Sequence, residues 1–282
     1  MKIAVLQTIV TDNKEKNLQE AEERIRSAAE RGAELAVLPE MFCCPYSGAY
    51  FRAFSEPAGG RIWSSLAEAA VRYKIAVAAG SMPESEDGRL YNTSFVFDSD
   101  GRQIARHRKM HLFDVDFRDG QYFKESDTFS AGDEVTLFDL GGMRFGLCIC
   151  FDMRFPELTR LMALQGAEAV VVPAAFNRTT GPMHWETMFR QRAADDQVYT
   201  IGCAPAADEN AEYVSYGNSI ICSPLGRILQ RAGTGPEMLL AEIDPEAVRE
   251  AREQLPLLPA RRTDIYEVRE KVRTGENPPG KI

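Results

Sequence analysis

The chain has 282 residues, of which 44% are hydrophobic and 27% are charged, as is typical of a globular protein. Its formal net charge of −9 argues against nucleic acid as the main partner, because nucleic-acid-binding surfaces are basic. No apolar run approaches the roughly 20 residues that cross a bilayer. The apolar N-terminus lacks a small-residue cleavage signal and is expected to be a strand rather than a signal peptide. We therefore expect neither a nucleic-acid partner nor a membrane partner.

Strand-like and helix-like segments alternate along the first half of the chain. Short apolar runs predict buried strands, and charged amphipathic stretches predict helices. The pair Asp100-Gly101 predicts the turn of a β-hairpin. The expected elements are a strand at 2–8, a helix at 17–31, a strand at 33–40, a helix at 60–73, a strand at 74–84 and a hairpin at 90–109.

The second half of the chain repeats this order. Two alignments carry the repeat: GAELAVLP (32–39) matches GAEAVVVP (166–173), and YNTSFVFDSDGRQI (91–104) resembles YGNSIICSPLGRIL (216–229). The expected elements here are a strand at 143–150, a helix at 156–166, a strand at 167–177, a helix at 185–197, a strand at 198–208 and a hairpin at 216–233.

Two similar α/β halves without a linker suggest two sheets stacked face to face, with helices outside. Such a core would be shared, so we expect residues 1–282 to form a single domain. Residues 244–282 carry a helix and then QLPLLPARRTDIYEV, which is apolar and proline-rich without a helical period. We expect a C-terminal arm that lies on a partner subunit, and hence a homodimer or a higher homo-oligomer.

The six cysteines are scattered through apolar segments rather than spaced as a disulfide framework. Free buried thiols in a cytoplasmic protein are the expected interpretation. A zinc site would need pairs such as Cys-x-x-Cys, and the sequence contains none. His107 and His111 stand four residues apart, but no glutamate lies beside them. We therefore expect no metal site.

The stretch GLCICFDMRFPE (146–157) places two cysteines two residues apart. Such a pair can be a metal half-site, a redox pair, or part of a buried strand in which one thiol is used. In a strand Cys148 and Cys150 would point the same way, side by side, and this disfavours a disulfide switch. The polar break after Cys150, with Pro156 beyond it, predicts a strand-to-helix turn. We expect Cys150 to be exposed at this turn, and Cys148 to lie deeper in the core.

Two more predicted strand ends carry charged residues. Glu40 ends an apolar run, where a carboxylate is unfavourable unless it is paired or used, and Lys109 follows the first hairpin. Glu40 could deprotonate the thiol of Cys150 if burial raised its own pKa. Lys109 and the backbone N–H of Phe151 could stabilise an oxyanion. The residues alone leave other roles open: a cap or ion pair for Glu40, a solvated charge for Lys109 and an inert core thiol for Cys150.

Three segments, LPEMF, HRKMHLFD and CFDMRFPE, together resemble the signatures of the nitrilase superfamily of carbon–nitrogen hydrolases. The likeness runs over nearly the whole chain and implies a four-layer α-β-β-α sandwich. It also implies a catalytic triad of Glu40 as base, Lys109 as oxyanion lysine and Cys150 as nucleophile. A second glutamate, Glu125 in YFKESDTF, is implied to position Lys109. The resemblance implies no metal and no organic cofactor.

Further segments are similar to the omega-amidase branch of this superfamily, namely HLFDVDFRDGQYFKES, AFNRTTGPMHWE and VSYGNSIICSPLGRIL. The resemblance implies a small-molecule substrate, the terminal amide of a short dicarboxylate monoamide such as 2-oxoglutaramate or 2-oxosuccinamate. Hydrolysis would pass through a thioester. The rivals are an amidase for deaminated glutathione or an N-carbamoyl compound, and a catalytically silent binding protein. The presence of all three signature residues counts against the silent protein.

The same resemblance implies a substrate pocket, whose residues are Tyr46, Arg154, Phe176 and Thr180, together with Phe151 through its backbone N–H. Arg154 is the expected partner of a substrate carboxylate, because its planar guanidinium can donate two parallel hydrogen bonds. The alternative for Arg154 is a structural ion pair with Asp152 or Glu157.

Three further residues belong to the segments that form this pocket. Arg178 departs from the family, whose members usually carry an apolar residue there, and it leaves the shape of the pocket open. His184 and Trp185 are expected to form and support the pocket wall.

Overall fold

The computed structural model describes residues 1–116 and 122–271. Its helices are α1 (Lys14–Glu30), α2 (Gly48–Phe54), α3 (Arg61–Tyr73), α4 (Pro156–Leu164), α5 (Thr180–Asp196) and α6 (Pro245–Gln254). Its strands are β1 (Lys2–Gln7), β2 (Leu35–Val37), β3 (Ala76–Ala78), β4 (Met82–Glu86), β5 (Arg89–Phe97), β6 (Gln103–Arg108), β7 (Asp114–Asp116), β8 (Tyr122–Lys124), β9 (Thr136–Leu140), β10 (Met143–Leu147), β11 (Ala169–Pro173), β12 (Tyr199–Cys203), β13 (Ile220–Cys222), β14 (Ile228–Arg231) and β15 (Glu237–Glu242). Short 3-10 helices lie at Glu125–Asp127 and Cys150–Arg154.

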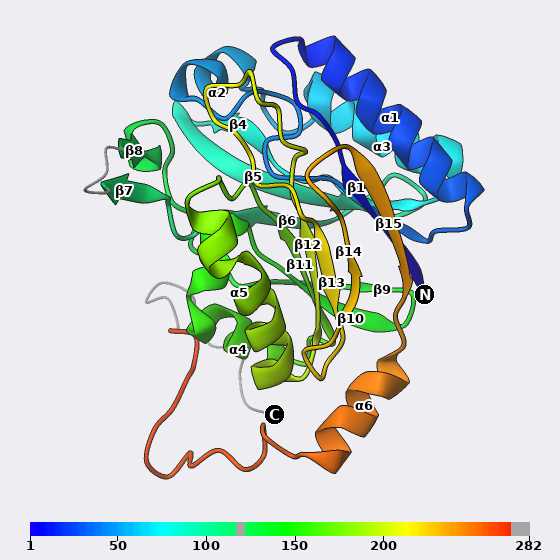
Figure 1. Cartoon of the computed structure of the whole chain (residues 1–282), viewed down its shortest axis with the longest axis vertical. Helices are drawn as coiled ribbons and strands as arrows, with labels where there is room; N and C mark the ends of the chain where they lie inside the picture. Colours follow the sequence, from blue (N-terminus) through cyan, green and yellow to red (C-terminus); the bar gives the residue numbers. More distant parts are fainter. Residues whose placement is uncertain (117–121, 272–282) are drawn as a thin grey trace.

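The chain folds into four layers. Two β-sheets lie face to face; α1 and α3 cover the outer face of one, and α4 and α5 cover the outer face of the other (Figure 1). The α-β-β-α fold implied by the resemblance is therefore confirmed. None of the helices in the described residues is both long enough and apolar enough to cross a bilayer.

The two sheets repeat one arrangement. In the described residues the first sheet has seven strands in the order β15-β1-β2-β3-β5-β4, with β6 paired to β5, and the second has six in the order β14-β13-β12-β11-β10-β9. β1 and β2 are parallel with Ile3 opposite Leu35, and β10 and β11 are parallel with Phe145 opposite Ala169. In each sheet an antiparallel hairpin follows the parallel strands, β5–β6 in one and β13–β14 in the other. The predicted internal repeat is thus present in the fold.

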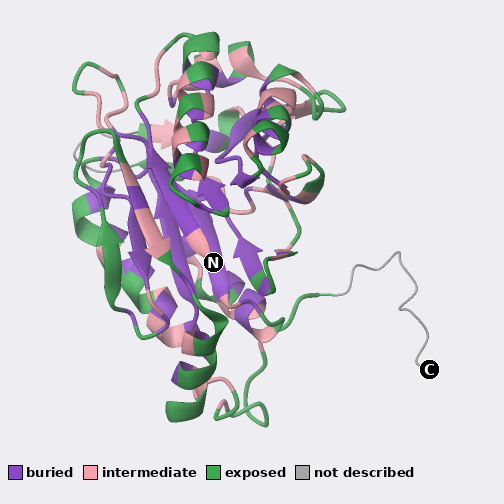
Figure 2. Cartoon of the chain, turned by 90° about the vertical axis from the view of Figure 1, so that its right-hand side faces the viewer, coloured by how far each residue is buried: buried purple, intermediate pink, exposed green. Residues whose placement is uncertain are grey.

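Alternate residues of the central strands enter different hydrophobic cores. Ile3 and Val5 of β1 pack between the two sheets, whereas Leu6 packs under α1 and α3. In the second sheet Val171 faces the core between the sheets, and Val170 packs under α4 and α5. The central strands therefore form the buried centre of the molecule, with exposed residues on the outer helices and loops (Figure 2). Burial of both faces explains why these strands are continuous apolar runs.

The structure divides the strand expected at 74–84 into β3 and β4. The chain turns between them at Gly80, whose φ is +56°. A Cβ atom at Gly80 would lie 2.1 Å from the backbone oxygen of Pro39, so only glycine fits this approach. The sequence patterns did not predict α2, β9, β15 or the β7–β8 hairpin. β15 returns from the second half to pair with β1, with Lys2 opposite Glu242.

The C-terminal segment begins with a helix docked on its own domain. Val248 of α6 is buried in the core between the sheets, and Gln197 donates to two carbonyls at the end of α6 at 2.8 and 2.7 Å. Residues 255–271 then run over the surface, mostly exposed or half-buried. Of the arm expected at 244–282, residues 272–282 lie outside the described residues. Its contact with a partner subunit stays a prediction.

Candidate active site

Three predicted catalytic residues follow strands that end at one edge of the stacked sheets. Glu40 follows β2, Lys109 follows β6 and Cys150 follows β10. The Nζ of Lys109 lies 3.0 Å from Oε1 of Glu40, and the thiol of Cys150 lies close enough to the same carboxylate to affect its pKa. The structure therefore brings the three side chains together, at the strand ends where α/β folds commonly build sites.

The loop that carries Glu40 is fixed by its backbone. Met41 has a φ of +52°, which is uncommon for a residue with a side chain. Its N–H donates to the hydroxyl of Ser81 at 3.1 Å, and Ser81 follows the close approach at Gly80. These contacts fix the backbone directly after Glu40, and the side chain of Glu40 is fully buried.

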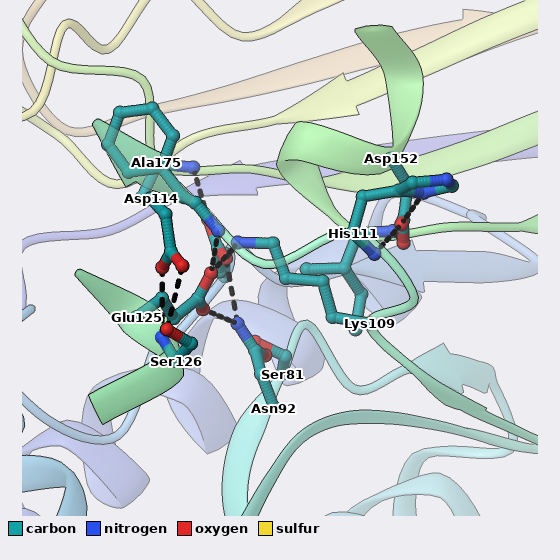
Figure 3. Close-up of polar contacts among 12 residues, drawn as sticks. Ser81, Asn92, Lys109, His111, Asp114, Glu125, Ser126, Asp152 and Ala175 are labelled. Atoms are coloured by element: carbon teal, nitrogen blue, oxygen red, sulfur yellow. Dashed lines mark hydrogen bonds and ion pairs between the residues drawn. The ribbon is translucent and has the colours of Figure 1, made fainter. Parts of the chain in front are cut away.

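Glu40, Glu125 and Lys109 form a cluster of two carboxylates and one ammonium, all with side chains 0% exposed. The Nζ of Lys109 lies 2.8 Å from Oε2 of Glu125, against 3.0 Å from Glu40. The amide of Asn92 donates to both carboxylates at 2.8 and 3.1 Å, and Figure 3 shows Lys109 and Asn92 converging on Glu125. The hydroxyl of Tyr46 lies 3.4 Å from each carboxylate. Glu125 is thus in direct contact with Lys109, and its role in positioning Lys109 stays a prediction.

Burial and neighbouring charges set the protonation states. Burial raises the pKa of Glu40; the charge of Lys109 opposes this and the charge of Glu125 adds to it. Burial by itself lowers the pKa of Lys109, but the charges of Glu125 and Glu40 outweigh it and raise that pKa well above its usual range. Burial and the charge of Glu40 raise the pKa of the Cys150 thiol well above its ordinary value. These shifts favour the protonated form of the Cys150 thiol, which lies close to the carboxylate of Glu40.

Cys150 lies at a turn, as predicted, but the strand before it ends earlier than predicted and its thiol is buried. β10 ends at Leu147, and Cys150 opens a 3-10 helix with a φ of +49°. Strand alternation therefore does not reach Cys150, and the expected common direction of Cys148 and Cys150 has no basis. Cys150 is only 5% exposed, so the expectation of an exposed thiol was wrong, because the loops of the cluster cover it. All six cysteines are free and buried, as expected.

Asp152 ties the loop of Lys109 to the turn of Cys150. One carboxylate oxygen accepts from the N–H of Ile149 and lies 3.0 Å from Nε2 of His107; the other accepts from the N–H groups of Met110 and His111 at 3.1 and 2.8 Å. Burial alone would raise the pKa of Asp152, but hydrogen bonds from the rings of His107 and His111 lower it. The two histidines spaced four apart therefore both hydrogen-bond the carboxylate of Asp152, and Figure 3 shows His111 beside Asp152.

Arg154 lies among aromatic rings near Cys150. Its guanidinium carbon is 4.8 Å from the ring centroid of Phe176 and 5.5 Å from that of Phe151. Its Nη1 lies 3.1 Å from Nδ1 of His184, and its Nε has no hydrogen-bond partner in the described part of the chain. Burial lowers the pKa of Arg154, which shows that its charge is poorly solvated.

The structure shows the contacts of two arginines that the sequence left open, Arg154 and Arg178. The alternative ion pair of Arg154 with Asp152 or Glu157 is absent from residues 1–116 and 122–271, because Asp152 bonds to the histidines instead. Arg178, which departs from the family pattern, pairs with Glu209 at the surface, with 54% and 63% of the two side chains exposed. Arg178 therefore forms an ion pair with the surface loop that contains Glu209.

The remaining predicted pocket residues lie at different depths. Thr180 begins α5 and is 4% exposed, and its hydroxyl donates to Oδ1 of Asn177 at 3.0 Å. Trp185 is fully buried and packs edge-on against Phe176, with ring centroids 5.1 Å apart. Trp185 thus supports the ring that faces Arg154, and Thr180 stabilises the turn into α5.

Comparison with known proteins agrees with this geometry. The family model of carbon-nitrogen hydrolases matches residues 2–253. The chain belongs to this family. Omega-amidase NIT2 of Bos taurus is 43% identical to this hydrolase over 270 residues, which cover 96% of this chain and 98% of that protein.

Two solved structures are similar to this carbon–nitrogen hydrolase. Nit3 of Saccharomyces cerevisiae, a member of branch 10 of the nitrilase superfamily, matches with a TM-score of 0.85 and 38% identity over 93% of this chain and 96% of that one. A mutant amidase from Nesterenkonia sp. AN1, with acrylamide added at its active-site cysteine, matches with a TM-score of 0.75 and 25% identity over 91% and 98%. The chain is an amidase of the nitrilase superfamily, a hydrolase of carbon–nitrogen bonds other than peptide bonds.

Sequence reasoning missed two groups at the site of this hydrolase. Asn92 is 1% exposed on β5, and a buried amide in an apolar strand was the signal that could have found it. The backbone N–H of Ala175, just after β11, donates to Oε2 of Glu40 at 2.8 Å. A backbone donor leaves no signal in the sequence.

A pocket of about 730 Å³ reaches the cluster from one side of the hydrolase. Its wall includes Glu40, Tyr46 and Tyr213, with further residues from the segments 10–16 and 205–215. This volume lies within the usual range for small-molecule sites, about 300–1,000 Å³, and suits a small amide substrate.

Proposed function

We propose that the chain hydrolyses its substrate through a thioester on Cys150. Glu40 takes the thiol proton as sulfur attacks the amide carbon, and Lys109 with the N–H of Phe151 stabilises the oxyanion. The carbon–nitrogen bond then breaks, Glu40 returns the proton to the leaving nitrogen, and ammonia departs. Glu40 next takes a proton from water as the water oxygen attacks the thioester. The carbon–sulfur bond breaks, sulfur regains a proton, and the carboxylic acid is released.

The contact of Glu40 with both Lys109 and Cys150 carries this proposal. Burial raises the pKa of the carboxyl and of the thiol, so the resting site holds a neutral thiol beside a strengthened base. A positioned base of this kind contributes about 10²–10⁴-fold to a rate. Glu125, 2.8 Å from Lys109, would hold the ammonium in place. The adduct at the active-site cysteine of the Nesterenkonia amidase supports a cysteine nucleophile.

The proposed substrate is the terminal amide of a short dicarboxylate, 2-oxoglutaramate or 2-oxosuccinamate. The bovine relative is named an omega-amidase, and Arg154 offers a cation with no carboxylate partner among the described residues. The net charge of −9 repels anions at long range, so a local cation would have to recover their binding. Phe151 and Phe176 hold the guanidinium in place, and Tyr46 and Thr180 would complete the pocket.

The test is a comparison of kcat/KM for 2-oxoglutaramate, glutamine, a simple aliphatic amide and deaminated glutathione. We expect 2-oxoglutaramate to exceed the aliphatic amide by about 10- to 100-fold, the range of a charge-assisted hydrogen bond. Arg154→Lys should lose most of this preference, because an ammonium does not reproduce a bidentate guanidinium. Glutamine should be a poorer substrate, since it carries an ammonium where 2-oxoglutaramate has its oxo group.

Two cysteine variants separate the mechanism from the substrate. Cys150→Ala should release no ammonia from any amide, whereas Cys148→Ala should stay active with reduced stability. Ammonia release by Cys150→Ala would refute the thioester, and iodoacetamide labelling mainly at Cys148 would do so too. A wild-type preference for the aliphatic amide or for deaminated glutathione would overturn only the substrate.

We also propose a cytoplasmic homodimer. Six free buried thiols suit a reducing compartment, and residues 255–271 expose apolar side chains, Leu255 by 56%, Ile265 by 68% and Tyr266 by 52%. Truncation after Gln254 keeps the docked helix α6 and should yield monomers by sedimentation. A truncated chain that still sediments as a dimer would refute the role of the arm, and cell fractionation would check the compartment.

A further inference from the structure

The backbone of Ala175 lies between the two reacting residues. Its N–H donates to Oε2 of Glu40 at 2.8 Å, and it lies near enough to Cys150 to lower the pKa of that thiol, against the effect of burial. Ala175 follows β11, and the N–H of Ala174 is held by the carbonyl of Cys203 at 2.8 Å. The site therefore contains a backbone donor to Glu40 that also lies close to Cys150.

The carbonyl of the same residue is held by a tyrosine from another loop. The hydroxyl of Tyr213 donates to the carbonyl oxygen of Ala175. The ring of Tyr213 stacks on that of Tyr46 with centroids 4.6 Å apart. Burial, with the charges of Cys150 and Glu40, raises the pKa of Tyr213 well above its usual range, so the hydroxyl remains a donor across the working pH. Ala175 is thus fixed at both its N–H and its C=O.

The loop that carries Tyr213 is fastened alongside residues 175–178. The N–H of Tyr216 donates to the carbonyl of Phe176 at 2.7 Å, and Asn177 forms a bridge with Ser215. The ion pair of Arg178 with Glu209 adds a contact at the surface. These contacts leave Tyr213 little freedom, so its hydroxyl is a fixed donor toward Ala175.

We propose that Tyr213 is a positioning residue of this amidase, whose hydroxyl holds the backbone of Ala175 so that its N–H stays directed at Glu40, beside Cys150. The inference rests on the proposed roles of those two residues. Without the hydroxyl, the carbonyl of Ala175 loses its donor and the residue can rotate. The N–H would then serve the carboxylate and the developing thiolate less well, so acylation slows and the proton affinity of Glu40 rises.

Tyr213→Phe tests the proposal, because it removes the hydroxyl and keeps the ring that stacks on Tyr46. We expect kcat to fall about three- to tenfold, the usual effect of one hydrogen bond. The acidic limb of kcat/KM, which reports Glu40, should move to higher pH, because a carboxylate that loses a donor binds its proton more tightly. The other groups facing Glu40, namely Lys109, Glu125, Asn92, Tyr46 and Cys150, are unchanged in this variant.

Tyr216→Phe is the matched control, since it makes the same change three residues away, where the hydroxyl has no polar partner in the described residues. Its kcat and its acidic limb should equal those of the wild type. An acidic limb of Tyr213→Phe that coincides with that of the control overturns the proposal, whatever the kcat. Activity of Glu40→Gln or Cys150→Ala in the same assay would instead refute the proposed mechanism, so the two failures are distinguishable.

Discussion

The β5–β6 hairpin has a buried glutamate on each of its two faces, and the two glutamates have different surroundings. On one face Glu84 lies 2.6 Å from Arg106 and 3.0 Å from Arg108. On the other face Glu40 lies 3.0 Å from Lys109. Both glutamates are 0% exposed, so burial alone does not distinguish them.

Neighbouring residues of the hairpin serve opposite clusters. Thr93 donates to Glu84 at 2.7 Å, whereas Asn92, the residue before it, donates to Glu40 at 2.8 Å. Arg108 pairs with Glu84, and the next residue, Lys109, enters the active site. Because side chains alternate across a strand, one hairpin supplies both clusters.

Charge balance and water separate the two clusters. Around Glu84, two arginines face two carboxylates, Glu86 being the second, and the Arg106 and Arg108 side chains are 31% and 21% exposed. In the Glu40 cluster two carboxylates share one ammonium, and all three side chains are 0% exposed. The balanced, partly solvent-exposed cluster joins strands, whereas the fully buried cluster has an excess negative charge that helps to raise the pKa of Glu40.

The largest expected difference comes from the same substitution in both clusters. Glu40→Gln should lower kcat by about 10²–10⁴-fold, because the base is lost, and mass spectrometry should find no covalent acyl adduct. Glu84→Gln should change kcat by less than about twofold and lower the free energy of unfolding by about 1–3 kcal/mol, since two arginines lose a buried anion. If Glu40→Gln still acylates at a near wild-type rate, Glu40 is a structural carboxylate like Glu84.

The adjacent cations sharpen the comparison. Lys109→Met should lower kcat by about 10²–10³-fold, because the oxyanion loses its cation and the two carboxylates must then share a proton. Arg108→Met should keep kcat and cost about 1 kcal/mol in urea unfolding, through the lost ion pair and the contact of Arg108 with the Tyr91 ring at 3.6 Å. Equal losses of activity in the two variants would show that the clusters are not functionally distinct.

The smallest expected effect is on the pH dependence of stability. The pKa of Glu40 is raised in the folded protein, so the folded state binds more protons than the unfolded state above the ordinary carboxyl pKa. The contribution of Glu40 to stability should therefore fall as pH rises through this window. The free energy of unfolding of wild type minus that of Glu40→Gln, from urea titrations between about pH 5 and pH 8, should decrease with pH. A difference that rises with pH would mean that the pKa of Glu40 is lowered by folding.

Asp152 has a pKa shift of the opposite sign to that of Glu40, and it serves as a control in the same experiment. Its pKa is lowered by its histidine partners, so its contribution is fully present above the ordinary carboxyl pKa and is lost as pH falls through the folded pKa. The difference between wild type and Asp152→Asn should therefore stay constant over the window in which that of Glu40→Gln changes. If the difference from wild type decreased with pH in the same way for both variants, the cause would be a general effect of pH on the fold rather than the titration of Glu40.

The sequence by itself determined the layers and named the three residues that we propose as the catalytic triad. Apolar runs and helical periods are local, so the buried strands and covering helices could be predicted from segments of about ten residues. The repeat of GAELAVLP as GAEAVVVP predicted two stacked halves. Glu40, Lys109 and Cys150 could be found because each stands just after a predicted strand, within a segment that resembles a family signature.

The tertiary structure decided how these residues work together. The N–H of Ala175 and the carboxylate of Glu40 are 135 residues apart, and the hydroxyl of Tyr213 reaches Ala175 across 38 residues. No local period records such contacts, because they depend on which loops the two sheets bring to one edge. The burial of Cys150 and its positive φ likewise follow from the packed loops around it. Local patterning places charged residues at strand ends, and only packing decides which of them lose water and share a proton.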